Sequence, residues 1–159
     1  MEENIMKNGG HESRIRQLQP EDRSRVEEII FLSGEFNEEE KVIALELVDE
    51  ALAKGEKSGY VVAVLEERKE HHTVVQGYVC YGPTPLTQGV FDLYWIAVDP
   101  EVRGMGFGRV LIQYVEQDVV ERGGRMLLIE TSSCSRVTTV RQASLLQVPG
   151  QDHHNALSG

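Results

Sequence analysis

The segment DPEVRGMGFGR (residues 99–109) constrains the fold most, because it joins two stretches of opposite character. Before it, VFDLYWIAV (residues 90–98) is rich in β-branched and aromatic residues and predicts a buried strand. After it, apolar residues recur at helical spacing, at Leu111, Val115 and Val119. The three alternating glycines between them predict a tight passage from strand to helix, with backbone that a ligand can approach closely.

A helix that begins at such a loop is suited to bind phosphate. The first N–H groups of a helix lack partners within it, and the helix dipole adds partial positive charge. Arg103 and Arg109 can add formal charge. A P-loop is excluded, because Gly108 is not followed by Lys and Ser or Thr, and a dinucleotide fingerprint would need glycine at position 109. A purely structural turn is the alternative interpretation.

The rest of the chain predicts a mixed α/β fold, with helices on the faces of one sheet. The predicted elements are a short strand at 13–18, helices at 20–34 and 37–55, and strands at 60–65, 73–81 and 125–130. Bulky Tyr94 and Trp95 are expected on opposite faces of their strand. The domain is expected over residues 13–133, after a disordered tail (1–12) and before an atypical tail (134–159).

Composition narrows the function classes. The formal charge of −10 argues against nucleic acid as a partner and is compatible with a cationic amine. Without an apolar run of membrane-spanning length or a signal-like start, the chain is expected to be cytoplasmic and to have no membrane partner. The two cysteines make no disulfide framework, and the paired histidines lack the spacing of a metal site, so no metal is expected.

The stretch Arg103-Gly104-Met105-Gly106-Phe107-Gly108 resembles the R/Q-x-x-G-x-G/A signature of the GNAT acetyltransferases. LYWIAVDP before it and IETSS after its helix are similar to the flanking strands of that family, and the resemblance covers about residues 15–133. It implies a GNAT-like, mostly antiparallel sheet and acetyl-CoA as co-substrate. The pyrophosphate would bind the N–H groups from Arg103 to Arg109, and the pantetheine arm would pair with Ile96, Ala97 and Val98.

The resemblance also implies direct attack of an amine on the thioester, for which a general base is useful. Asp92 is the first candidate, because alternation places it on one face with Tyr94 and Ile96; a solvated strand-edge carboxylate is the alternative. Glu130, at the end of the next strand, is the second candidate. The family's late tyrosine, which protonates the leaving thiolate, has no counterpart after Ser133, and Cys134 or Ser135 are the remaining options.

After residue 133 the expected helix and two strands of the family are not recognisable. Our hypothesis is that the sequence departs from the ancestral one near Thr138, by frameshift, truncation or an alternative ending. Missing strands would leave residues 126–130 nearer an exposed sheet edge, which favours homodimerisation by strand exchange or instability.

The sequence therefore predicts an N-acetyltransferase that uses acetyl-CoA and a small-molecule or protein amine. Two alternatives stay open: a catalytically silent module that binds acyl-CoA, and a truncated or frameshifted product without function. The loops at 33–37 and 82–89 are expected to contact the acceptor.

Overall fold

Strands that follow one another in the chain also lie side by side in the sheet. The computed structural model describes residues 4–8, 11–131 and 134–139. Its sheet has the order β1-β2-β3-β4-β5-β6-β7, and all neighbouring pairs are antiparallel except β5 and β6. The strands are β1 (Asn4–Asn8), β2 (His11–Gln17), β3 (Val61–Arg68), β4 (Thr73–Pro83), β5 (Val90–Val98), β6 (Met126–Thr131) and β7 (Cys134–Thr139).

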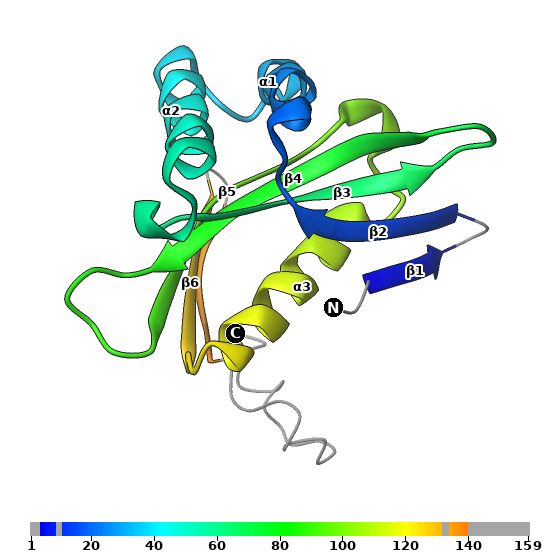
Figure 1. Cartoon of the computed structure of the whole chain (residues 1–159). Coiled ribbons are helices and arrows are strands. Elements are labelled where there is room, and N and C mark those ends of the chain that lie inside the picture. The colour runs from blue at the N-terminus through cyan, green and yellow to red at the C-terminus, as the bar shows by residue number, and fades with distance from the viewer. Residues whose placement is uncertain (1–3, 9–10, 132–133, 140–159) are drawn as a thin grey trace.

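Helices cover both faces of this sheet (Figure 1). Helices α1 (Arg23–Leu32) and α2 (Glu38–Lys54) lie on one face, and α3 (Phe107–Glu121), which connects β5 to β6, lies on the other. Short 3-10 turns occur at Pro20–Asp22, Gly55–Ser58 and Pro100–Val102. The mixed α/β fold predicted from the sequence is confirmed. None of the helices in the described ranges has the length and apolar character needed to span a membrane.

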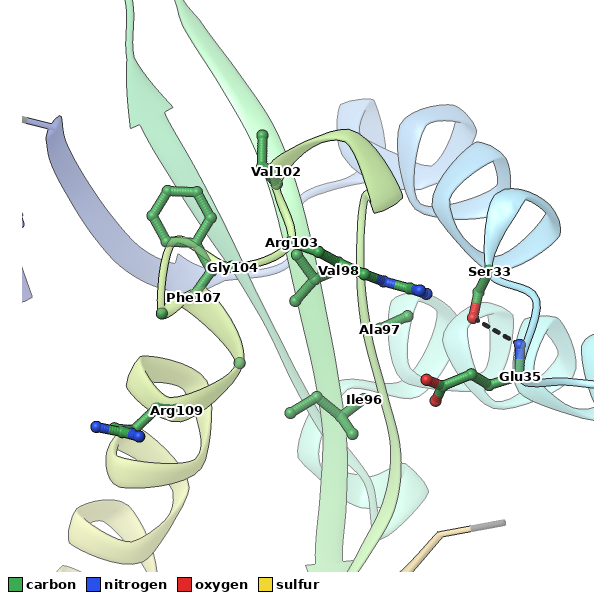
Figure 2. A pocket seen from close by; sticks show the side chains of 12 residues that line it. Ser33, Glu35, Ile96, Ala97, Val98, Val102, Arg103, Gly104, Phe107 and Arg109 are labelled. Carbon is green, nitrogen blue, oxygen red and sulfur yellow. Dashed lines mark hydrogen bonds between the residues drawn. The ribbon is translucent and has the colours of Figure 1, made fainter. Parts of the chain in front are cut away.

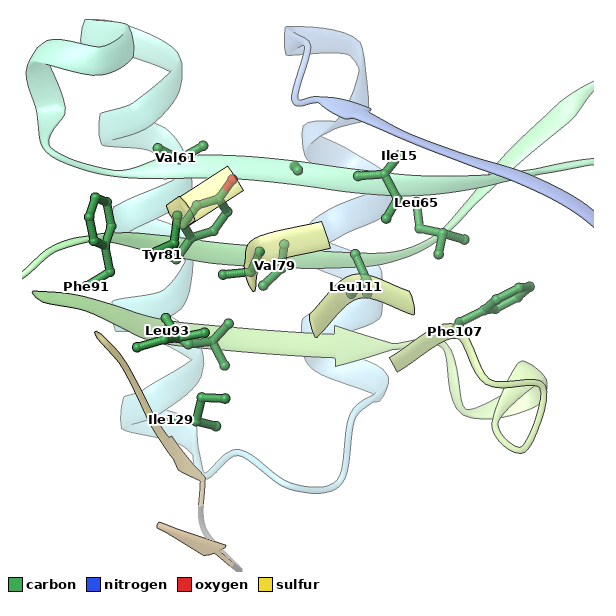
Figure 3. Packing of buried hydrophobic residues seen from close by; sticks show 14 residues of the cluster. Ile15, Val61, Leu65, Val79, Tyr81, Phe91, Leu93, Phe107, Leu111 and Ile129 are labelled. Atoms are coloured by element: carbon green, nitrogen blue, oxygen red, sulfur yellow. The ribbon is translucent and has the colours of Figure 1, made fainter. Parts of the chain in front are cut away.

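The central strands β3 and β4 divide their side chains between two cores. Leu65, Val79 and Tyr81 pack under α3 with Leu111 (Figure 3). The alternate positions of the same strands pack under α1 and α2, where Tyr78 is fully buried. Burial on both faces explains the continuous apolar runs of these strands.

A bulge in β5 corrects the predicted alternation of its side chains. Cys80 pairs with Trp95, but the next residue of β4, Tyr81, pairs with Leu93, which leaves Tyr94 as an extra residue. Tyr94 and Trp95 consequently both pack against the core under α1 and α2. The expectation that they face opposite sides is wrong, because one inserted residue reverses the alternation.

Both ends of the described chain extend the sheet beyond the predicted domain. The predicted strand at 13–18 is confirmed as β2, but Asn4–Asn8, expected within a disordered tail, pair with it as β1. At the other end, β7 pairs with β6. In the described sheet, β6 is therefore the second strand from this edge, and β7 is the edge strand. The rest of the predicted tails, residues 1–3, 9–10 and 140–159, lies outside the described residues.

Candidate functional site

The second half of β5 has one side without a strand partner. Pairing with β4 continues to Val98, whereas pairing with β6 ends at Leu93. The N–H of Asp99 donates to the Gln76 carbonyl of β4 at 2.8 Å, so alternation turns the N–H and C=O of Ile96 and Val98 away from β4. Among the described residues, no strand pairs with that side of β5 beyond Leu93. An extended ligand can pair there as an added strand.

The loop after β5 delivers the chain to the N-terminus of α3. Gly104 and Gly106 have positive φ, 89° and 84°, a conformation that favours glycine. Gly106 is the N-cap residue, and no side chain of the described residues caps this helix end. A Cβ added at Gly108 would meet no atom within 4 Å. The fold itself therefore does not require glycine at 108, whereas a ligand close to the backbone would.

The second half of β5 and the N-terminus of α3 border one cavity of about 510 Å³ (Figure 2). Nine of the ten residues predicted to bind the cofactor line it: Ile96, Ala97, Val98, Arg103, Gly104, Gly106, Phe107, Gly108 and Arg109. The tenth, Met105, instead packs against the core under α3.

Two arginines line this cavity with different orientations. Figure 2 shows Arg103 extending toward the loop between α1 and α2, while Arg109 points outward from α3, away from that loop. Both are exposed, and neither forms a salt bridge with any described residue. Their charges are available to an anion, and Arg103 is the better placed.

Asp99 holds the start of the loop in place. Its carboxylate accepts hydrogen bonds from the Glu101 N–H and from Arg25 of α1, both at 2.8 Å. Arg25 also donates to the Val75 carbonyl of β4 at 2.7 Å, which ties α1 to the same corner of the sheet. Burial alone would raise the pKa of Asp99, but the two hydrogen bonds and the charge of Arg25 lower this pKa below its ordinary value.

The first predicted base, Asp92, does not line the cavity. Asp92 lies four residues before Ile96, about 13 Å along an extended strand, and its carboxylate accepts a hydrogen bond from the Thr84 hydroxyl at 2.7 Å. The bulge leaves Asp92 facing the same side as Tyr94 but not the side of Ile96, contrary to the sequence prediction. Glu130 lies in β6 opposite Ser135.

The side chains of Glu130, Cys134 and Ser135 lie outside what the structure describes. Their predicted roles as base or acid stay predictions. The loop at 82–89 contributes no residue to the cavity lining, although it was expected to contact the acceptor.

Three lining residues lie outside the predicted cofactor set. Val102 belongs to the 3-10 turn before the loop, and Ser33 and Glu35 come from the loop between α1 and α2. The sequence predicted that the 33–37 loop contacts a substrate, but it gave no signal that Ser33 and Glu35 are the residues of this loop that line the cavity. Helix α2 and strands β3 and β4 separate this loop from β5 in the chain, so only the fold brings them together.

Comparison with known proteins identifies the class. The model of the acetyltransferase (GNAT) family matches residues 19–139, so the chain belongs to that family. The match includes β7, beyond the end of the resemblance predicted from the sequence. A search of curated proteins gave no match.

Solved structures share the fold. A protein from Desulfovibrio desulfuricans, described as an acetyltransferase of the GNAT family, is 41% identical, with a TM-score of 0.67 over 75% of this chain and 73% of that one. A GNAT acetyltransferase from Brucella melitensis, in complex with acetyl-CoA, is 22% identical (TM-score 0.57; 74% of each chain). The PaiA N-acetyltransferase of Thermoplasma acidophilum, in complex with coenzyme A, is 16% identical (TM-score 0.57; 76% and 82%).

Proposed function

We propose that this protein is an N-acetyltransferase that transfers the acetyl group of acetyl-CoA to a primary amine by direct attack. The observation that carries the proposal is the continuity of the site. The open side of β5, with the N–H and C=O of Ile96 and Val98, leads into the uncapped N-terminus of α3 within one cavity. A ligand with an amide-bearing arm and a pyrophosphate matches that sequence of donors and acceptors.

The pyrophosphate, the pantetheine arm and the thioester of acetyl-CoA each have a counterpart among the described residues. The pyrophosphate would be held by the first N–H groups of α3 and by Arg103, where the absence of a Cβ at Gly108 lets it approach the backbone. The pantetheine amides would pair with Ile96 and Val98. Backbone N–H groups at the unpaired part of β5 would polarise the thioester carbonyl that the amine attacks.

One observation favours a second candidate function, binding of acyl-CoA without catalysis. Asp92, the first predicted base, does not line the cavity and is held by Thr84. A water chain can replace a direct base in removing the amine proton, so this observation lowers the expected rate without excluding transfer.

Calorimetric titration of acetyl-CoA, followed by an assay of free CoA thiol with a panel of primary amines, tests the proposal. S-acetylpantetheine, which lacks the pyrophosphate, is the matched ligand. We expect saturable binding of acetyl-CoA, much weaker binding of the shortened ligand, and amine-dependent thiol release. Binding without release by any amine would support the silent module, and absence of binding by the folded chain would refute both functions.

A further inference from the structure

Glu35 lines the cavity, and the proposed acetyl transfer gives its carboxylate no role. Among the described residues that line the cavity, Glu35 is the only acidic one. The formal positive charges of the lining are those of Arg103 and Arg109, at the loop and at the first turn of α3. The lining therefore presents one cation, Arg109, on α3 and an anion, Glu35, on the loop between α1 and α2, while Arg103 extends from the loop before α3 toward the latter side.

The backbone around Glu35 is held from three sides. Ser33, at the end of α1, is buried, and its hydroxyl accepts a hydrogen bond from the Glu35 N–H at 3.3 Å. The Phe36 ring packs edge-on against Trp95 of β5, with ring centroids 5.1 Å apart. Asn37 then begins α2 with a capping box. The backbone that carries Glu35 is consequently held close to β5, while the Glu35 side chain itself is exposed.

The Glu35 carboxylate is directed at β5 and has no partner among the residues that the structure describes. Figure 2 shows it pointing from the loop toward β5, beside Ile96 and Ala97. No described residue forms a salt bridge or a side-chain hydrogen bond with this carboxylate. Neighbouring Glu38 and Glu40 differ, because they pair with Lys41 and with the N–H of Asn37.

We propose that Glu35 binds the protonated amine, or a second cationic group, of the acceptor, and that the acceptor class is therefore an aliphatic polyamine or another cationic amine. This inference rests on the proposed function. Two substrates of opposite charge would then share one cavity, with the phosphates at α3 and the ammonium group at Glu35. The formal charge of −10 favours the approach of such an acceptor.

Calorimetry on the protein saturated with CoA measures this binding without requiring turnover. Spermidine is the cationic probe, and aniline, which is neutral at neutral pH, is the uncharged amine. Glu35→Gln removes the charge, and Glu39→Gln, at an exposed position on the first turn of α2, makes the same change in net charge away from the cavity. We expect Glu35→Gln to weaken spermidine binding about 10-fold or more, and Glu39→Gln to change it less than about 2-fold.

The controls separate this proposal from the proposed function. CoA should bind the wild type and both variants with similar affinity, and aniline binding should not respond to Glu35→Gln. Failure of CoA to bind the wild type would count against the proposed function itself. Three results with CoA bound would each overturn the role of Glu35. The first is an equal loss of spermidine affinity in both variants, and the second is an unchanged affinity of Glu35→Gln for spermidine. The third is that the wild type does not bind spermidine.

Discussion

Helices α2 and α3 begin in opposite ways. The first turn of α2 carries Glu38, Glu39 and Glu40, and a capping box joins Asn37 to Glu40. The Asn37 side chain accepts a hydrogen bond from the Glu40 N–H at 2.8 Å, and the Glu40 carboxylate accepts one from the Asn37 N–H at 2.9 Å. The first turn of α3 has no acidic residue, and its N-cap is Gly106. One helix satisfies its end with its own side chains, whereas the other leaves its end open.

The difference shows how the same physics serves stability in one place and binding in another. Unpaired N–H groups and the positive end of the helix dipole occur at both helices. In α2 the chain supplies the anions itself, so no outside ligand is needed. In α3 the chain supplies glycine and nearby arginines, which leaves the same donors for an outside anion.

Placing a carboxylate at the uncapped N-terminus of α3 should have the largest effect on acetyl-CoA binding. Gly108→Glu is expected to weaken acetyl-CoA binding about 100-fold or more, because it replaces several charge-assisted hydrogen bonds with repulsion. Gly108 does not have a positive φ and a Cβ there meets open space, so thermal unfolding should show an unchanged or higher Tm. Gln113→Glu, exposed on the same helix, is the control for added charge. A loss of affinity accompanied by a lower Tm would argue for misfolding instead.

Removing the positive charge of Arg103 should have the second largest effect on acetyl-CoA binding. Arg103→Ala is expected to weaken acetyl-CoA binding about 10-fold or more, because a hydrogen bond to a charged group is lost. Arg109→Ala should cost less, since its side chain points outward from α3. Arg68→Ala, an exposed arginine at the end of β3, controls for net charge. Calorimetry would contradict this ranking if the three variants bound acetyl-CoA equally.

The hydrogen bonds of Asp99, which hold the loop before α3, should make the stability of the protein depend on pH. The folded-state pKa of Asp99 is lowered below its ordinary value of 3.8, so its contribution is present above that value and is lost as the pH falls below it. Asp99→Asn should lower the free energy of unfolding by about 1–3 kcal/mol near neutral pH. The difference from wild type, measured by urea unfolding, should shrink below pH 3.8. A difference that stays constant with pH would exclude this role of the charge.

Removing the N-cap of α2 should have the smallest effect on stability and should leave acetyl-CoA binding intact. Asn37→Ala is expected to lower the free energy of unfolding by about 1 kcal/mol, because the Glu40 N–H loses its cap. Asn37 does not line the cavity, so the Kd for acetyl-CoA should stay within about 2-fold. Urea unfolding and calorimetry on the same preparation measure both quantities. A larger change in Kd than in stability would show that the two helix ends are coupled.

The sequence predicted most of the fold because its signals were local. Apolar runs marked β3, β4 and β5, the Asn37–Glu40 spacing marked the start of α2, and the alternating glycines marked the start of α3. Nine of ten predicted cofactor residues line the cavity for the same reason, since the loop and the end of β5 are contiguous in the chain.

What the sequence missed depends on contacts between distant segments. The bulge at Tyr94 arises from pairing with β4 and has no signature in the β5 residues alone, so the predicted orientation of Asp92 relative to Ile96 failed. Glu35 lines the cavity because the fold brings its loop to β5, where Phe36 packs on Trp95. Strand β1 is short and polar, and only its ladder with β2 makes it a strand.

The order of the sheet has a consequence for how the protein is made. Because the strand order repeats the chain order, each described strand from β2 onward can pair with the strand that precedes it in the chain, and the sheet can grow one strand at a time from the N-terminal side during translation. Two helical connections interrupt this order: α1 and α2 join β2 to β3, and α3 joins β5 to β6 after β5 has already paired with β4. A nascent chain halted before α3 would therefore present the whole outer side of β5 as an unprotected edge, which is where we expect chaperones or aggregation to act first.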